Sequence, residues 1–235
     1  MFSWKKQASY YNSGGWRATW NGEGGGVLLN QCPHNLDLMQ WICGMPSKVQ
    51  AFCHEGKWHD IEVEDDVTAY LEYENGATGV FVTTTADAPG TNRFEITMEK
   101  AKLVCEDDKL SVYELDVNER EHCFKEPEGF KKPEGHWTEV ETDGKNPQHM
   151  GVLAAFAGKI LHGTPLIADG TEGINGLILS NCMHLSSWLK QPVTLPIDED
   201  LYLEELNKRR AASKQKKNVV EVTFTTEDTY GSKKS

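Results

Sequence analysis

The order of hydrophobic and polar positions divides the chain into a helical start, a strand-rich middle and a helical end. Residues 27–43 carry apolar side chains at helical spacing along one side, the pattern of a half-buried helix. That apolar side is formed by Cys32, Leu36, Met39 and Cys43. Pro33 fits only a first turn, which places the helix start near Asn30, and Gly44 stands where a C-terminal cap belongs.

The middle of the chain has the two-residue period of β-strands. Alternation is clearest over residues 67–73, and Asn75 with Gly76 after it is a strong hairpin signal. Further strands are predicted over residues 77–85, 94–98, 102–106 and 110–115. Successive strands joined by short turns predict an antiparallel sheet with one face to cover. Residues 118–145 are polar and contain two prolines, which predicts a long loop.

Helical periodicity returns in the last third. It predicts helices over residues 147–163 and 171–190, and a third helix that begins at Asp198. The order of elements predicts an α+β fold, an open and mostly antiparallel sheet with helices packed on one face. We expect one domain over residues 1–210, followed by a tail, 211–235, in which the alternating run 219–225 fits an edge strand.

Composition and charge narrow the classes of partner. The net charge of −12 disfavours nucleic acid and anionic membranes, because phosphate binding needs clustered lysine and arginine. No apolar run approaches the roughly 20 residues of a membrane span, and the first residues lack a signal peptide, so we expect a cytoplasmic protein. The six cysteines form no CxxC pair, which favours reduced thiols over a zinc site.

Three polar residues share the other side of the first predicted helix. Asn30, His34 and Asp37 lie at spacings of four and three, nearly opposite the apolar stripe, and they follow the glycines at positions 24–26. Because imidazole titrates near neutral pH, His34 is a candidate proton acceptor, with a structural histidine as the alternative. Asp37 is expected either to orient His34 or to cap local backbone. We expect the His34 ring to point into an open cleft floored by the glycines.

The glycine run does not read as a dinucleotide site. Its spacing differs from GxGxxG, and it follows polar residues rather than an apolar strand. We therefore expect this chain alone to bind no nicotinamide cofactor.

Four stretches of the chain resemble one known family. Residues 16–46 resemble the start of the C-terminal domain of the Gfo/Idh/MocA oxidoreductases, NAD(P)-dependent dehydrogenases of sugars, inositols and related polyols. Residues 88–96, 164–189 and 191–198 resemble later parts of that domain, whose fold is like the C-terminal domain of dihydrodipicolinate reductase. The resemblance implies a separate Rossmann domain that holds NAD or NADP and a catalytic lysine, neither of which is found in this sequence. It also implies a homodimer or homotetramer formed through the uncovered sheet face, where an apolar surface favours association.

The resemblance also implies roles for particular residues. In the family, a helix after the glycines carries an acidic residue and, four positions later, a histidine that exchanges a proton with the substrate hydroxyl. His34 falls on the histidine position, but Asn30 occupies the acidic one and cannot take a proton, which puts a two-group relay in doubt. Arg17, Tyr11 and His149 are further candidates to contact a sugar or polyol. Two functions stay open: the substrate-binding half of a dehydrogenase, or a non-catalytic ligand-binding or oligomerisation module without cofactor.

Overall fold

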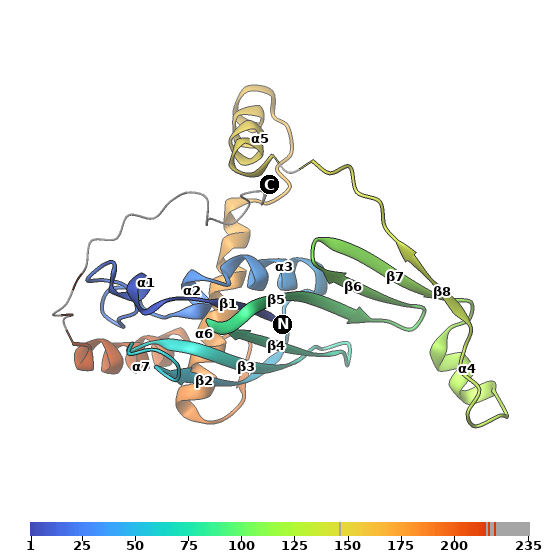
Figure 1. Cartoon of the computed structure of the whole chain (residues 1–235), viewed down its shortest axis with the longest axis horizontal. Coiled ribbons are helices and arrows are strands. Elements are labelled where there is room, and N and C mark those ends of the chain that lie inside the picture. The colour runs from blue at the N-terminus through green and yellow to red at the C-terminus, as the bar shows by residue number, and fades with distance from the viewer. Residues whose placement is uncertain (146, 215, 217–218, 220–235) are drawn as a thin grey trace. The chain divides into compact units, whose positions relative to one another are not determined.

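The computed structural model describes residues 1–145, 147–214, 216 and 219, and they form one sheet with helices (Figure 1). The strands are β1 (Phe2–Lys5), β2 (Lys48–Glu55), β3 (Glu64–Glu72), β4 (Thr78–Thr84), β5 (Ala86–Thr97), β6 (Ala101–Glu106), β7 (Lys109–Leu115), β8 (Gly135–Glu139) and β9 (Val193–Thr194). The helices are α1 (Ala8–Asn12), α2 (Val27–Asn30), α3 (Pro33–Cys43), α4 (Glu119–Lys125), α5 (Gln148–His162), the 3-10 helix η1 (Gly170–Glu172), α6 (Gly173–Leu189) and α7 (Glu199–Ala212).

The nine strands follow the order β8-β7-β6-β5-β1-β4-β3-β2-β9. All ladders with a described register are antiparallel except the parallel pair of β1 and β4. The predicted α+β fold with an open, mostly antiparallel sheet is therefore confirmed. The chain divides into two compact units: Phe2–Thr91 together with the residues from Gln148 onward, and Met1 together with Asn92–Pro147.

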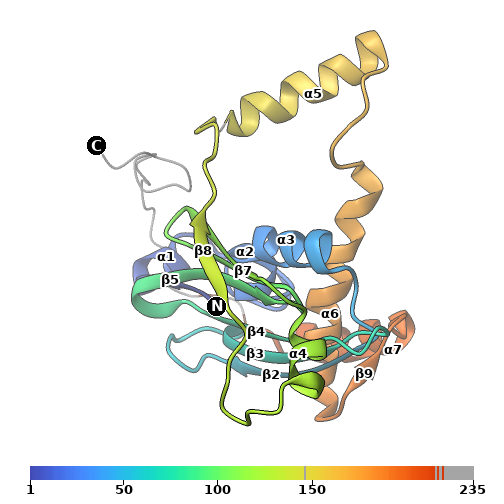
Figure 2. The same cartoon turned by 90° about the vertical axis from the view of Figure 1, so that its right-hand side faces the viewer.

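The larger unit holds the hydrophobic core between its strands and α6. Strands β2, β3 and β4 pair in register, so that alternate side chains point to one face. The buried face carries Val49, Ala51, Val67, Ala69, Leu71 and Phe81. Helix α6 covers that face and lies beside α3 and β2, as the two views of Figures 1 and 2 both show. The opposite face leaves apolar side chains exposed, among them Phe52, Tyr70 and Val80.

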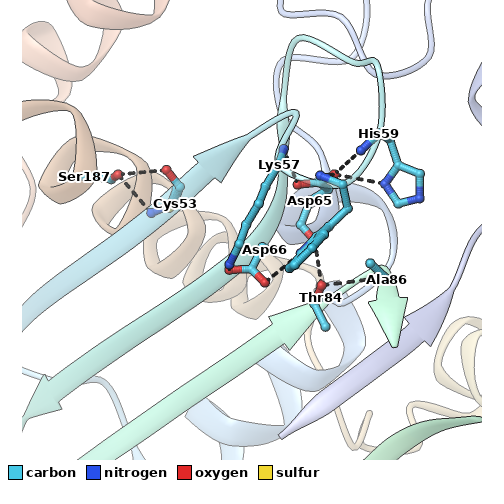
Figure 3. Close-up of polar contacts among 9 residues, drawn as sticks. Cys53, Lys57, His59, Asp65, Asp66, Thr84, Ala86 and Ser187 are labelled. Carbon is cyan, nitrogen blue, oxygen red and sulfur yellow. Dashed lines mark hydrogen bonds and ion pairs between the residues drawn. The ribbon is translucent and has the colours of Figure 1, made fainter. Parts of the chain in front are cut away.

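Two hydroxyl groups fasten α6 to the sheet. The Ser186 hydroxyl accepts a hydrogen bond from the Ala51 amide (3.0 Å), and the Ser187 hydroxyl accepts one from the Cys53 amide (2.9 Å; Figure 3). A buried donor or acceptor that lacks a hydrogen bond is costly. These two bonds therefore stabilise the fold and also favour one position of α6 along β2. The position of α6, the helix that carries His184, is therefore fixed relative to β2.

The smaller unit contains two elements that the sequence did not predict. Residues 118–145 were expected to be loop, and that prediction is wrong for α4 and β8. Helix α4 begins because the Asn118 side chain accepts a hydrogen bond from the Glu121 amide (3.2 Å). Strand β8 exists because it pairs with β7, where the rings of Tyr113 and Trp137 lie 5.2 Å apart. Pairing with a distant strand leaves little periodicity in the sequence to detect.

The first predicted helix is two helices. Helix α2 ends at Asn30, and α3 begins at Pro33, which occupies the first turn where its missing N–H costs nothing. The prediction of one continuous helix over residues 27–43 is therefore wrong, although its end at Gly44 is right. The three later helices match α5, α6 and α7, and Asp198 caps α7 by accepting from the Leu201 amide (2.9 Å). Nearly all of the predicted edge strand 219–225 lies outside the described residues.

Two further expectations concern the chain as a whole. None of the six cysteines forms a disulfide. Within the described residues, no helix has both the length and the apolar character needed to cross a bilayer.

Candidate functional site

A cavity of about 610 Å³ lies between α3 and the segment that leads from η1 into α6. Helix α3 contributes His34, Asp37 and Trp41 to its wall. Asp169 and Glu172 line it from the η1 side. The remaining wall is mostly apolar and is formed by Leu28, Leu29, Pro33, Ile167, Ala168 and Leu177 with the glycines at 170, 173 and 176 and Ser180. All of these residues belong to the larger unit.

His34 and Asp37 open into this cavity together. They lie one turn apart on α3, and both side chains are exposed. The Asp37 carboxylate accepts a hydrogen bond from the Gln40 side chain (2.9 Å), and Gln40 in turn accepts one from Asn175 of α6 (3.1 Å). The chain of bonds from α6 therefore fixes the rotamer of Asp37 on the cavity wall.

Asn30 does not share this cavity. The side-chain oxygen of Asn30 accepts hydrogen bonds from the Tyr10 hydroxyl (3.0 Å) and from the side-chain amide of Gln31 (3.1 Å). The side-chain NH₂ group of Asn30 donates to the Glu23 carboxylate. The prediction that Asn30, His34 and Asp37 lie on one face is wrong, because the break between α2 and α3 interrupts the helical period between Asn30 and His34.

A second polar cluster surrounds Asn30. Arg17 donates to the Tyr10 hydroxyl (3.0 Å), and its guanidinium lies 4.6 Å from the centres of the Tyr10 and Trp16 rings. Arg17 is thus joined to Asn30 through Tyr10. The Glu23 carboxylate accepts from the Ala18 amide (2.5 Å) as well as from Asn30, and burial raises its pKa above the ordinary value. Sequence reasoning missed Glu23, although it stands in the glycine-rich run seven residues before Asn30.

Three of the candidate contact residues, Arg17, Tyr11 and His149, are not among the residues that line the cavity. Tyr11 is 4% exposed and packs in a hydrophobic cluster with Trp20 and Val63. Its hydroxyl donates to Thr85 (2.7 Å), so its polar end is used inside the fold. His149 lies exposed on α5, a helix with no buried residue.

The glycines at 24–26 do not floor the cavity as we expected. The amides of Gly26 and Leu28 donate to the carboxylate of Glu64 at 2.9 and 3.0 Å. A Cβ atom added to Gly26 would lie 2.1 Å from the backbone oxygen of Glu64. The run therefore lets α2 begin against β3, and an internal carboxylate occupies the amides at the start of the helix.

Glu64 is paired as well as buried. Its side chain is 0% exposed, and the Nε2 atom of His184 lies 3.1 Å from its Oε2 atom. Burial raises the pKa of Glu64, but the charge of His184 and the backbone hydrogen bonds outweigh burial and lower the pKa on balance. His184 of α6 therefore contacts a fully buried carboxylate of β3. The 3.1 Å contact lies within ion-pair distance and lacks the geometry of a hydrogen bond.

The cavity combines hydrogen-bonding side chains with an apolar wall. His34 can accept a proton from a hydroxyl, and Asp37 and Glu172 can accept hydrogen bonds from others. Trp41, which is 60% exposed, offers an aromatic face to the C–H side of a ring. No group of three or more metal-ligating side chains occurs among the described residues.

Comparison with known proteins adds a family. Residues 1–104 match the family model described as the GFO/IDH/MocA C-terminal domain. No curated protein matches. Among solved structures, the WlbA dehydrogenase from Bordetella pertussis, in complex with NADH and UDP-GlcNAcA, aligns with a TM-score of 0.63 and 22% identity over 83% of this chain and 53% of its own. Levoglucosan dehydrogenase in complex with NADH aligns with a TM-score of 0.65 and 17% identity over 83% of this chain and 57% of its own. The chain thus spans little more than half the length of these structures.

Proposed function

We propose that the chain is the substrate-binding half of an NAD(P)-dependent dehydrogenase acting on a sugar or related polyol, on the premise that residues 1–104 match the GFO/IDH/MocA C-terminal domain. The observation that carries this proposal is the placement of His34 and Asp37 on the wall of one cavity. At about 610 Å³ the cavity is in the range of small-molecule sites. The WlbA dehydrogenase structure is a complex with UDP-GlcNAcA, and one levoglucosan dehydrogenase structure is a complex with levoglucosan; both support this class of substrate.

The glycine run of this chain does not fit a dinucleotide. The amides that would cradle a pyrophosphate already donate to Glu64, and a second anion there would be repelled by that buried carboxylate. We therefore assign NAD or NADP to a companion domain, where the nicotinamide would accept a hydride from the substrate carbinol carbon.

The part of the reaction left to this chain is proton transfer and orientation. Oxidation of a carbinol releases the hydroxyl proton, and the ring of His34 accepts it. Asp37, held by Gln40, accepts a hydrogen bond from a neighbouring hydroxyl and so fixes which carbinol faces His34. Trp41 covers an apolar face of the sugar ring. Since Asn30 cannot ionise, His34 is the acid/base group that this chain supplies.

The test joins this chain to a cofactor-binding domain and follows nicotinamide absorbance on a panel of sugars and inositols. The variant His34→Ala should lower turnover by roughly 10²–10⁴-fold, the usual worth of a positioned acid/base group. His149→Ala is the matched control, because that histidine is exposed and lies off the cavity. Full activity in His34→Ala would show that the histidine is structural.

The second candidate function is a non-catalytic ligand-binding module, favoured by the asparagine at position 30. It predicts that the fused protein binds a sugar from the panel and binds NAD(P)H but shows no turnover. Turnover by the unsubstituted fused protein separates the two, because a dehydrogenase oxidises a sugar of the panel and a module does not.

We also propose that the chain associates through the uncovered sheet face as a homodimer or homotetramer. Phe52, Tyr70 and Val80 present a side chain from each of three adjacent strands there, exposed by 58%, 43% and 64%. Sedimentation velocity should show Val80→Glu shifting the species toward the monomer, whereas Phe124→Glu on α4 should not. A strictly monomeric parent protein would contradict the proposal.

A further inference from the structure

Two consecutive carboxylates of β3 are both fully buried and hold two different segments. Glu64 and Asp65 are each 0% exposed. Successive side chains of a strand point to opposite faces, so the two carboxylates reach different parts of the fold. Glu64 accepts from the amides at the start of α2, as described above. Asp65 accepts from the amides of Lys57, Trp58 and His59 at 2.9–3.0 Å and also contacts the His59 ring (Figure 3).

Helix α2 depends on a partner from outside itself. It has four residues, a single turn, and isolated helices shorter than about 12 residues are marginal in water. The residue at its N-cap is Gly26, which has no side chain to accept from the first amides. The carboxylate of Glu64 supplies that acceptor from β3, in a buried setting where an unmade hydrogen bond is costly.

A series of backbone hydrogen bonds connects the start of α2, where Glu64 binds, to the turn that contains His34. The Gly26 carbonyl accepts from the Asn30 amide (3.0 Å), and the Val27 carbonyl accepts from the Cys32 amide (3.0 Å). The Cys32 carbonyl then accepts from the amide of Leu36 (3.1 Å), in the turn of α3 that contains His34. Consecutive backbone hydrogen bonds thus link the amides that bind the Glu64 carboxylate to the first turn of α3.

The Glu64 carboxylate is itself held in place by the side chain of His184 and the rings packed around that histidine. His184 sits 3.1 Å from Glu64, and its ring stacks on Trp188 at 5.3 Å with an interplanar angle of 5°. Trp20 meets the His184 ring edge-on at 5.6 Å, and the Arg209 guanidinium lies 3.9 Å from the Trp188 ring centre. A side chain enclosed in this way has little freedom to leave the amides of α2.

We propose that Glu64 is a positioning residue for the site: its carboxylate, braced by His184, sets the start of α2 and thereby the place of the His34 ring on the cavity wall. The inference rests on the proposed function only in giving His34 its chemical role, because the position of the ring can be measured without turnover. A carboxylate that merely stabilised the fold would affect His34 no more than Asp65 does.

The experiment compares Glu64→Gln with Asp65→Asn in this chain. Each substitution keeps size and turns one acceptor oxygen into an N–H donor, at neighbouring positions of the same strand. Histidine ring signals are recorded by ¹H–¹³C correlation, and the His34 signal is assigned by its loss in His34→Gln. We expect both variants to melt at lower temperature, but only Glu64→Gln to move or broaden the His34 signal by more than a linewidth.

Two results would overturn the proposal: an unchanged His34 signal in Glu64→Gln, or an equal change in Asp65→Asn. If Glu64→Gln does not fold, the parent protein still decides. Scalar coupling across the hydrogen bonds from the Gly26 and Leu28 amides to the Glu64 carboxyl carbon must then be observable, and its absence rejects the anchor. Failure of the His34→Ala turnover test leaves these readings intact, so the two proposals fail separately.

Discussion

The three consecutive glycines offer a graded test of the packing between α2 and β3. Alanine is introduced at each position in turn. At Gly24 the added Cβ meets nothing within 4 Å, but the residue has φ +81°, which a side chain disfavours. At Gly25 the Cβ would lie 2.8 Å from the end of the Leu29 side chain, which can move, and 3.0 Å from the Cε1 atom of the enclosed His184 ring. At Gly26 it would lie 2.1 Å from the backbone oxygen of Glu64, which cannot move without displacing β3.

The expected costs follow from these distances. Gly24→Ala should lower the free energy of unfolding by about 1 kcal/mol, the penalty of the left-handed region. Gly26→Ala forces α2 away from β3, which costs about 1–3 kcal/mol as overpacking. It also weakens the hydrogen bonds to the buried Glu64 carboxylate, which are worth about 1.5–3 kcal/mol when an ion is involved. The sum, roughly 2.5–6 kcal/mol, is a large fraction of the about 5–15 kcal/mol that stabilises a domain.

Urea unfolding followed by tryptophan fluorescence measures all three variants under one set of conditions. The predicted order of destabilisation is Gly26→Ala above Gly25→Ala above Gly24→Ala. Equal costs at Gly24 and Gly26 would refute the reasoning, since they would mean that α2 can shift away from β3 freely. The histidine signal of His34 should follow the same order, because the same displacement carries α3 with it.

Two further outcomes test the polar clusters. Burial raises the pKa of Glu23 above its ordinary 4.5, so the folded state keeps the carboxyl proton to higher pH than the unfolded state does. The contribution of Glu23 to the free energy of unfolding is therefore full below pH 4.5 and is lost as pH rises through the raised pKa. Glu23→Gln should therefore flatten the decline in urea midpoint above pH 4.5, and an unchanged pH profile would contradict the burial of this carboxyl. Tyr11→Phe removes the hydrogen bond to Thr85 and should cost about 1 kcal/mol of unfolding free energy without changing sugar affinity, whereas a selective loss of affinity would place Tyr11 in the site.

The elements that sequence predicted well are those whose signal is local. The alternation over residues 67–73 and the Asn75 and Gly76 turn correspond to β3 and its hairpin with β4. Asp198 and the acidic first turn mark the start of α7. Strand β8 was missed because it is held by pairing with β7, and that pairing leaves no clear period in the sequence of β8 itself.

The part of the site that was predicted correctly also has a local signal in the sequence. His34 and Asp37 are three residues apart within α3, so helical spacing alone puts them on one wall. Asn30 was misplaced because the period was carried through the break before Pro33. Glu64 was not found, since its contact with Gly26 spans 38 residues of sequence and nothing in either segment announces the other.

The glycine run shows that a glycine-rich helix start can be interpreted only when the group bound by its backbone amides is known. Glycines that lead into a helix leave amides free to bind an anion, and a phosphate is the usual inference. Here the anion is Glu64, and the close approach that needs Gly26 is an approach of β3 rather than of a ligand. With its first amides occupied internally, α2 has one remaining use in the proposed reaction, which is to hold α3 so that His34 faces the cavity. The occupied helix start therefore supports our proposal that a companion domain, rather than this chain, would bind the cofactor.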